Sequence, residues 1–308
     1  MRIAILAFLF TILGVHTEDG MLVTSAWLAE HLRDPAVVLI EIGPKDSYDT
    51  GHIPGGRYVD FHAFAAPHQM GPDHEAPKPG TVPALYLELP PAGQLDSLLG
   101  SLGISAHSRV VVSFSGDWVT PAARVYLTLD YAGLRGRVSL LDGGLTAWRA
   151  EGRPLSKETP PTRAGSFHST PESDVVVSAS WVTSHLQDPQ VKVVDARSPE
   201  FYLDTVDNMM PRGGHIAGAV NIPFEDLVDS TTMRLKDTPE LARIFRAAGV
   251  RQGQTVVGYC HIGQQASLVY FAARRLGYEA RLYDGSFQEW SAHPDWPIEG
   301  SHRAATGH

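Results

Sequence analysis

The residue that could carry covalent chemistry is Cys260, the single cysteine of the 308-residue chain. An apolar, β-rich stretch over 255–259 precedes it, and a helical pattern with one apolar face begins a few residues after it. A strand that passes through a tight loop into a helix points backbone N–H groups and the positive helix end at the loop. Such a loop favours an anion, so we expect Cys260 to be a reactive thiolate that titrates below about 7.5.

The loop after the cysteine supplies the predicted cradle for a charged sulfur. Gly263 permits a tight bend. Successive N–H donors are expected to point inward from the residues His261, Ile262, Gly263, Gln264, Gln265 and Ala266. The imidazole of His261 could add a partial positive charge, because it titrates near neutral pH. The alternative interpretation is a small buried hydrophobe in an ordinary strand-to-helix turn.

Two arginines are candidates for binding an anionic substrate near this loop. Arg197 follows the predicted strand 191–195, and ligands of α/β folds bind beyond the carboxyl ends of parallel strands. Arg212, which precedes a Gly-Gly-His segment, is the second candidate. Either arginine could instead form a structural ion pair, for which Asp195 and Glu200 are the available partners.

The chain repeats itself, and the repeat indicates which elements position the cysteine. Matching segments occur in the same order in both halves: 22–28 with 176–182, 37–42 with 191–195, 51–55 with 214–218, 110–112 with 256–257, and Asp142-Gly143 with Asp284-Gly285. Such regular correspondence indicates a duplicated domain. Short Val/Ile-rich runs alternate with helical stretches such as 123–132 and 239–248. This alternation predicts an α/β protein in which each domain is a mainly parallel sheet with helices on both faces.

Composition sets the predicted boundaries. Residues 1–20 combine a charged start, an apolar run and a polar end, which is typical of a secretory signal peptide. Two domains follow, over 21–150 and 175–300, and a proline-rich linker over 151–174 joins them. Export predicts a periplasmic or secreted protein with no stable membrane span after processing, whereas a true start at Met21 would leave it cytoplasmic.

The charge and the cysteine count exclude several function classes. A net charge of −9 argues against nucleic-acid binding, because a phosphate backbone requires a basic face. A single cysteine excludes an internal disulfide and a cysteine-rich metal site.

From about Leu22 to Ile298 the chain resembles the tandem rhodanese family of thiosulfate and 3-mercaptopyruvate sulfurtransferases. The motifs that carry the resemblance are two Gly-His-Ile-x-Gly segments, Val194-Asp195-Ala196-Arg197, the Cys260-x-x-Gly-x-x-Ala loop, and Tyr283-Asp284-Gly285-Ser286 leading to Trp290. The resemblance implies that Cys260 takes sulfur from thiosulfate as a persulfide and passes it to cyanide or a thiol. It also implies a donor-binding Arg197, a first domain without the cysteine that shapes the cleft, and no metal or organic cofactor.

Two alternatives stay open beside thiosulfate transfer, and a third, phosphate hydrolysis, is disfavoured. The loop has neither the Arg and Lys of thiosulfate enzymes nor the Gly-Ser of mercaptopyruvate enzymes, so 3-mercaptopyruvate is the alternative donor. A cysteine phosphatase would need an arginine closing the loop, and none occurs before Arg274. A non-catalytic sulfur-carrier or binding module of the rhodanese type would share the whole pattern.

Overall fold

The protein contains two similar α/β units, and the computed structural model describes residues 20–67, 84–207 and 209–300 of the chain. The first unit holds a five-stranded sheet of order β1-β5-β4-β2-β3, and every pairing in it is parallel. Its strands are β1 (Leu22–Val23), β2 (Val37–Ile42), β3 (Arg57–Tyr58), β4 (Arg109–Phe114) and β5 (Val138–Leu141). The predicted signal segment lies, except for Gly20, outside the described residues.

The second unit repeats this topology in the order β6-β11-β10-β7-β9, again with parallel pairings. Its strands are β6 (Val176–Val177), β7 (Val191–Asp195), β9 (Val220–Asn221), β10 (Thr255–Tyr259) and β11 (Glu279–Tyr283). A small antiparallel pair, β8 (His215–Ile216) with β12 (Ile298–Glu299), is added to this unit. The predicted α/β class with two tandem, mainly parallel sheets is confirmed.

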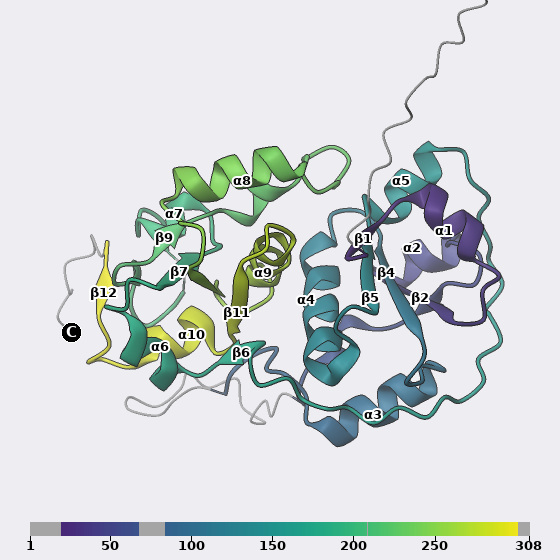
Figure 1. The fold of residues 1–308 in the computed structure, drawn as a ribbon, viewed down its shortest axis with the longest axis horizontal. Helices are drawn as coiled ribbons and strands as arrows, with labels where there is room; N and C mark the ends of the chain where they lie inside the picture. Colours follow the sequence, from purple (N-terminus) through teal and green to yellow (C-terminus); the bar gives the residue numbers. More distant parts are fainter. Residues whose placement is uncertain (1–19, 68–83, 208, 301–308) are drawn as a thin grey trace, which may run out of the picture.

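Helices flank both sheets (Figure 1). Those of the first unit are α1 (Ser25–His31), α2 (Lys45–Thr50), α3 (Ala92–Ser101), α4 (Val119–Leu129) and α5 (Gly144–Ala150), with short turns η1 (Phe61–Phe64) and η2 (Asp130–Leu134). Those of the second are α6 (Ala179–His185), α7 (Pro199–Tyr202), α8 (Thr238–Ala247), α9 (Ala266–Arg275) and α10 (Ser286–Ala292), with η3 (Phe224–Leu227). Within the described ranges, no helix combines the length and the apolar character that a bilayer span requires.

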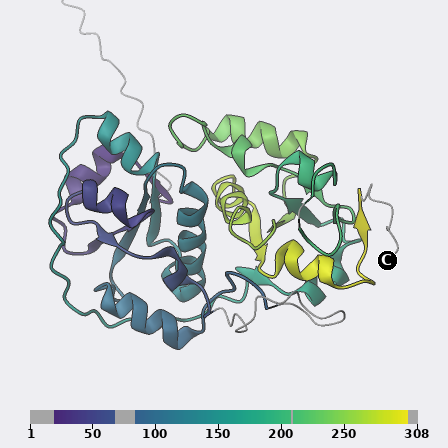
Figure 2. The same cartoon turned by 180° about the vertical axis from the view of Figure 1, so that it is seen from behind.

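The two units meet along α4 and α9, which lie side by side at the centre of both views (Figures 1 and 2). Every residue of α4 is buried, as is α9 from Ala266 to Ala273, because each helix packs on its own sheet and on the other helix. Tyr126 and Phe271 form an edge-to-face ring pair with centroids 4.8 Å apart. One hydrophobic core therefore runs through both units without a solvated break.

The proline-containing segment between the units is extended and follows the surface of the first unit. Its Ser156 exchanges two backbone hydrogen bonds with His52, and Ser169 binds the Asp96 carboxylate on α3. His52 is buried and binds carbonyls through both ring nitrogens, which gives it a structural role. These contacts anchor the linker to the first unit before the chain enters β6.

Candidate active site at Cys260

Cys260 directly follows β10, and its side chain is only 1% exposed. Its backbone N–H donates to the Ser286 hydroxyl (3.3 Å), and its carbonyl accepts from the N–H of Phe287 (2.9 Å). These bonds join the cysteine to the first turn of α10. On the other side, the backbone N–H groups of Ile262, Gln265 and Ala266 hydrogen-bond the sulfur. The strand, the loop and two helix starts thus surround a single sulfur atom.

Burial raises the pKa of the Cys260 thiol, and the three amides, which lower it, compensate only in part. Nearby Asp195 adds a smaller upward shift. The predicted pKa below about 7.5 is therefore wrong for the substrate-free enzyme. The sequence indicates the amides correctly, but it does not reveal that the sulfur is almost completely removed from water.

This pKa direction predicts how fast the free enzyme is alkylated at different pH values. Only the thiolate reacts, so the iodoacetamide rate should still be increasing with pH beyond about 8.5, the ordinary cysteine value. Mass spectrometry of the carboxamidomethylated protein gives the rate, and the same chain in guanidinium gives the reference curve. A rate that is already constant by about pH 7.5 would show that the amides outweigh burial.

Gly263 is required by both its backbone angle and its surroundings. Its φ of +81° lies in the left-handed region, where side chains other than hydrogen are strained. A Cβ at this position would lie 2.9 Å from Arg124 Nη1 and 3.2 Å from the carbonyl oxygen of Asp284. The bend that brings the amides to the sulfur therefore leaves no room for a side chain at position 263.

Arg197 is completely buried next to the cysteine loop. Its Nε donates to both oxygens of Asp195 (3.0 and 3.1 Å), and its Nη2 binds Asp195 Oδ2 (2.5 Å) and the Gly214 carbonyl (2.8 Å). Its guanidinium carbon is 4.1 Å from the Phe287 ring centroid. Burial opposes the charge, but Asp195 and, less strongly, Cys260 raise the pKa of Arg197 overall. The structural ion pair considered for this arginine is present, and buried Nη1 has no hydrogen-bond partner among the described residues.

Arg212 does not take part in the cysteine loop, so its predicted role in substrate binding is wrong. Its guanidinium donates to five carbonyl oxygens at and beyond the end of α10, those of Trp290, Ser291, His293, Pro294 and Trp296. Helix ends leave carbonyls without partners, and a cation satisfies them well. Arg212 therefore closes α10 at the end opposite Cys260.

His261 does not supply the expected positive charge. Burial and the nearby Arg197 lower the pKa of its imidazole to about 4, so the ring is neutral at neutral pH. The ring packs edge-to-face against Phe201 with centroids 4.7 Å apart. His261 is thus part of the apolar wall beside the loop, and the prediction of a partial cation is wrong.

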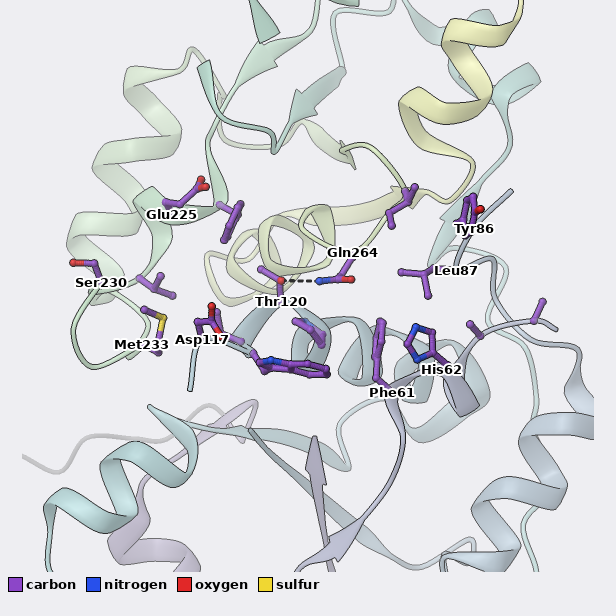
Figure 3. A pocket seen from close by; sticks show the side chains of 18 of the residues that line it. Phe61, His62, Tyr86, Leu87, Asp117, Thr120, Glu225, Ser230, Met233 and Gln264 are labelled. Atoms are coloured by element: carbon purple, nitrogen blue, oxygen red, sulfur yellow. Dashed lines mark hydrogen bonds between the residues drawn. The ribbon is translucent and has the colours of Figure 1, made fainter. Parts of the chain in front are cut away.

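A cavity of about 800 Å³ lies between the two units, next to this loop (Figure 3). The second unit contributes Ile262 and Gln264 of the loop, and Gln264 Nε2 donates to Thr120 Oγ1 of the first unit (3.1 Å). Most of the remaining lining residues are apolar or aromatic: Phe61, Ala65, Ala66, Pro67, Tyr86, Leu87, Trp118, Val119, Pro121, Phe224, Val228 and Met233. The polar remainder is His62, Asp117, Ser230 and Glu225.

Comparison with known proteins identifies the family of this chain. The family described as "Rhodanese-like domain" matches twice, over residues 24–151 and 178–293. The chain belongs to the rhodanese-like family. It is 33% identical over 283 residues to the thiosulfate sulfurtransferase of Azotobacter vinelandii, covering 91% of this chain and 97% of that protein. It is 30% identical over 286 residues to the 3-mercaptopyruvate sulfurtransferase of Escherichia coli, covering 89% and 95%.

A solved structure shares the fold of both rhodanese-like domains. The crystal structure of SseA from Escherichia coli, described as a 3-mercaptopyruvate sulfotransferase, superposes with a TM-score of 0.72 at 28% identity. The match covers 86% of this chain and 98% of SseA. The resemblance that the sequence motifs indicated is therefore confirmed for both domains.

In the first rhodanese-like domain, Phe114 occupies the position of Cys260. The strand register fixes this equivalence. In the first domain Val112 pairs with Leu140, and in the second Gly258 pairs with Leu282. Phe114 and Cys260 each follow two residues after the first member of these pairs. The loop after Phe114 and the first turn of α4 contribute Asp117, Trp118 and Thr120 to the cavity. Sequence reasoning missed these three residues, although the alignment of the two halves placed this segment opposite the cysteine.

Two aspartates that the sequence analysis marks only as matching positions of the repeat each bind the other domain. Asp284 accepts the Leu89 N–H (2.8 Å) and pairs with Arg124 Nη2 (2.6 Å), a guanidinium that is 1% exposed. Its counterpart Asp142 accepts the Leu235 N–H (3.1 Å) and pairs with Arg234 (3.4 Å). We call these two contacts the reciprocal clasps. The sequence feature that could have revealed these contacts is the matching position of the two aspartates in the repeat.

Proposed function

We propose that this rhodanese-type sulfurtransferase moves a sulfane sulfur from thiosulfate to cyanide or a thiol through a persulfide on Cys260. One observation carries the proposal: the sulfur of Cys260 receives three backbone N–H groups, and the loop that supplies them forms part of the wall of a substrate-sized cavity. Amides held at fixed positions stabilise a sulfur anion without any reorganisation during the reaction.

In the first step the Cys260 thiolate attacks the outer sulfur of thiosulfate. A new S–S bond forms, the bond between the two thiosulfur atoms breaks, and sulfite leaves with its electron pair. Charge is conserved, because the persulfide anion keeps one negative charge and sulfite carries two. The amides of Ile262, Gln265 and Ala266 hold the attacking sulfur, and Arg197 supplies a buried positive charge that interacts with it.

The raised pKa of the Cys260 thiol makes this first step depend on pH. Because burial raises the pKa of Cys260, little thiolate exists in the free enzyme at neutral pH. The active species is therefore the small thiolate fraction, and kcat/KM for the donor should increase with pH through the neutral range. This increase follows the direction of the pKa shift, since deprotonation creates the nucleophile.

3-Mercaptopyruvate is the second candidate donor. The sequence offered three positive groups for an anionic donor: Arg197, Arg212 and His261. Two of them are unavailable to bind thiosulfate, because Arg212 is bonded to carbonyls and His261 is neutral. Arg197 remains and can serve either anion. Steady-state kcat/KM values for the two donors, measured with the same acceptor, decide between them. If kcat/KM is at least tenfold higher for 3-mercaptopyruvate, that compound replaces thiosulfate as the proposed donor.

Intact-mass spectrometry after incubation with thiosulfate tests the persulfide itself. The expected result is a gain of one sulfur atom that a thiol or cyanide then removes. If thiosulfate and 3-mercaptopyruvate both fail to add sulfur to the folded protein, the chain is a rhodanese-type binding module, and the enzymatic proposal falls.

We further propose that the protein acts in the periplasm or outside the cell. The support is the charged start and apolar run within residues 1–20, and a true start at Met21 would instead give a cytoplasmic protein. N-terminal sequencing of the protein purified from its native cells distinguishes the two, since removal of the first residues requires export.

A further inference from the structure

The interdomain cavity is much larger than thiosulfate or cyanide. Its volume of about 800 Å³ is that of a site for an organic molecule of many atoms. Thiosulfate and cyanide contain only a few atoms each, so most of the cavity would stay unfilled during their turnover. The cavity therefore has room for a larger second substrate beside the Cys260 loop.

The walls of the cavity are suited to an apolar or aromatic body. The described lining includes the rings of Phe61, Tyr86, Trp118 and Phe224. The buried residues Val119 and Val228 add further apolar surface. Apolar surface of this kind binds hydrocarbon through its removal from water. Aromatic faces also attract cations, and Trp does so most strongly.

The charged residues in the described part of the cavity lining are acidic. Asp117 and Glu225 come from different domains and lie on the same side of the cavity, near Ser230 and Met233 (Figure 3). Both side chains are exposed at its rim. The part of the lining that the structure describes contains no lysine or arginine, and His62 is its only other titratable side chain besides Tyr86. The rim therefore attracts positive charge and repels carboxylates.

We propose that this cavity receives the sulfur acceptor, and that it selects an organic thiol with an apolar or aromatic body and a positively charged group. The inference rests on the proposed persulfide at Cys260 and specifies which molecule removes its sulfur. The acceptor thiolate attacks the outer sulfur, the S–S bond to Cys260 breaks, and the Cys260 thiolate leaves. The products are the acceptor persulfide and the free enzyme, and the thiol proton goes to solvent.

Binding without chemistry is the first test. Calorimetry on the Cys260→Ser variant compares 2-phenylethylammonium with 3-phenylpropionate, which share a phenyl ring and a two-carbon chain but differ in charge. We expect the ammonium to bind about five times more tightly at low salt, and the preference to weaken at high salt. Equal affinity, or tighter binding of the carboxylate, would overturn the proposal and leave the persulfide chemistry untouched.

Single-turnover kinetics is the second test. Enzyme carrying the Cys260 persulfide is mixed with 2-aminoethanethiol, 2-mercaptoethanol or 3-mercaptopropionate, and each rate is divided by the thiolate concentration. The cationic thiol should react about fivefold faster than the anionic one. The double variant Asp117→Asn/Glu225→Gln should remove this preference, whereas Asp226→Asn, a neighbouring charge outside the lining, should keep it.

The two tests separate the possible failures. A persulfide that forms normally but shows no charge preference toward acceptors overturns this inference alone. Failure of every donor to form a persulfide overturns the proposed function, and the calorimetric comparison still reports on the cavity. A charge preference that persists in Asp117→Asn/Glu225→Gln contradicts the assignment of the acidic rim.

Discussion

Replacing Cys260 with serine is expected to lower the rate of sulfur transfer by about four orders of magnitude. A serine hydroxyl ionises far less readily than a thiol and cannot form the S–S bond that stores the transferred sulfur. The measurement is kcat/KM for thiosulfate with cyanide as the acceptor, followed as thiocyanate. Intact-mass spectrometry of the same variant should show no added sulfur.

The same variant should fold normally, which separates lost chemistry from lost structure. The bonds that tie residue 260 to Ser286 and Phe287 involve only its backbone and are unchanged in the variant. The amides around the sulfur can donate to a serine hydroxyl, so the buried oxygen has partners. The melting temperature should therefore stay close to that of the wild type. Turnover within tenfold of the wild type in a folded variant would assign the chemistry to another residue.

Arg197→Ala is expected to lower both stability and activity. It leaves the buried carboxylate of Asp195 without its partner, which costs about 3–5 kcal/mol of unfolding free energy. It also removes a positive charge that interacts with the sulfur, and loss of one charge-assisted contact raises the activation free energy for kcat/KM with thiosulfate by about 1.5–3 kcal/mol. Guanidinium unfolding gives the first quantity and steady-state kinetics the second.

A second variant separates these two effects of Arg197. In Arg197→Met/Asp195→Asn both buried charges are removed together, so much of the lost stability should return. Activity with thiosulfate should stay low, because the cation is still missing. If activity returns with stability, Arg197 only supports the fold; if Arg197→Ala retains wild-type kinetics, it has no part in the site.

The duplication made most of the fold predictable. The segment 37–42 is β2 as predicted, and 239–248 differs from α8 by one residue at each end. The helix predicted over 123–132 is less accurate, because α4 begins at Val119 and gives way at Asp130 to the irregular turn η2. An alternation of short apolar strands with helices is a pattern of local residues, so it can be recognised without knowing any long-range contact.

The errors at the site have a different origin, since they depend on partners distant in sequence. Arg212 resembles a free cation until folding places the carbonyls of residues 290–296 around it. His261 titrates normally in an unfolded chain, and only burial beside Arg197 makes it neutral. The amides around Cys260 were predictable because they belong to the same short loop. The acidic rim was not, because it joins Asp117 and Glu225 from different domains.

The reciprocal clasps have a consequence for how the two halves of the gene can evolve. Arg124 of the cysteine-free half pairs with Asp284 in the catalytic half, while Asp142 of the cysteine-free half accepts the Leu235 N–H of the other. Each copy therefore supplies contacts to its twin, and we expect either half to be less stable if it is expressed alone. Selection can retain the cysteine-free copy for these contacts, although that copy has no thiol of its own.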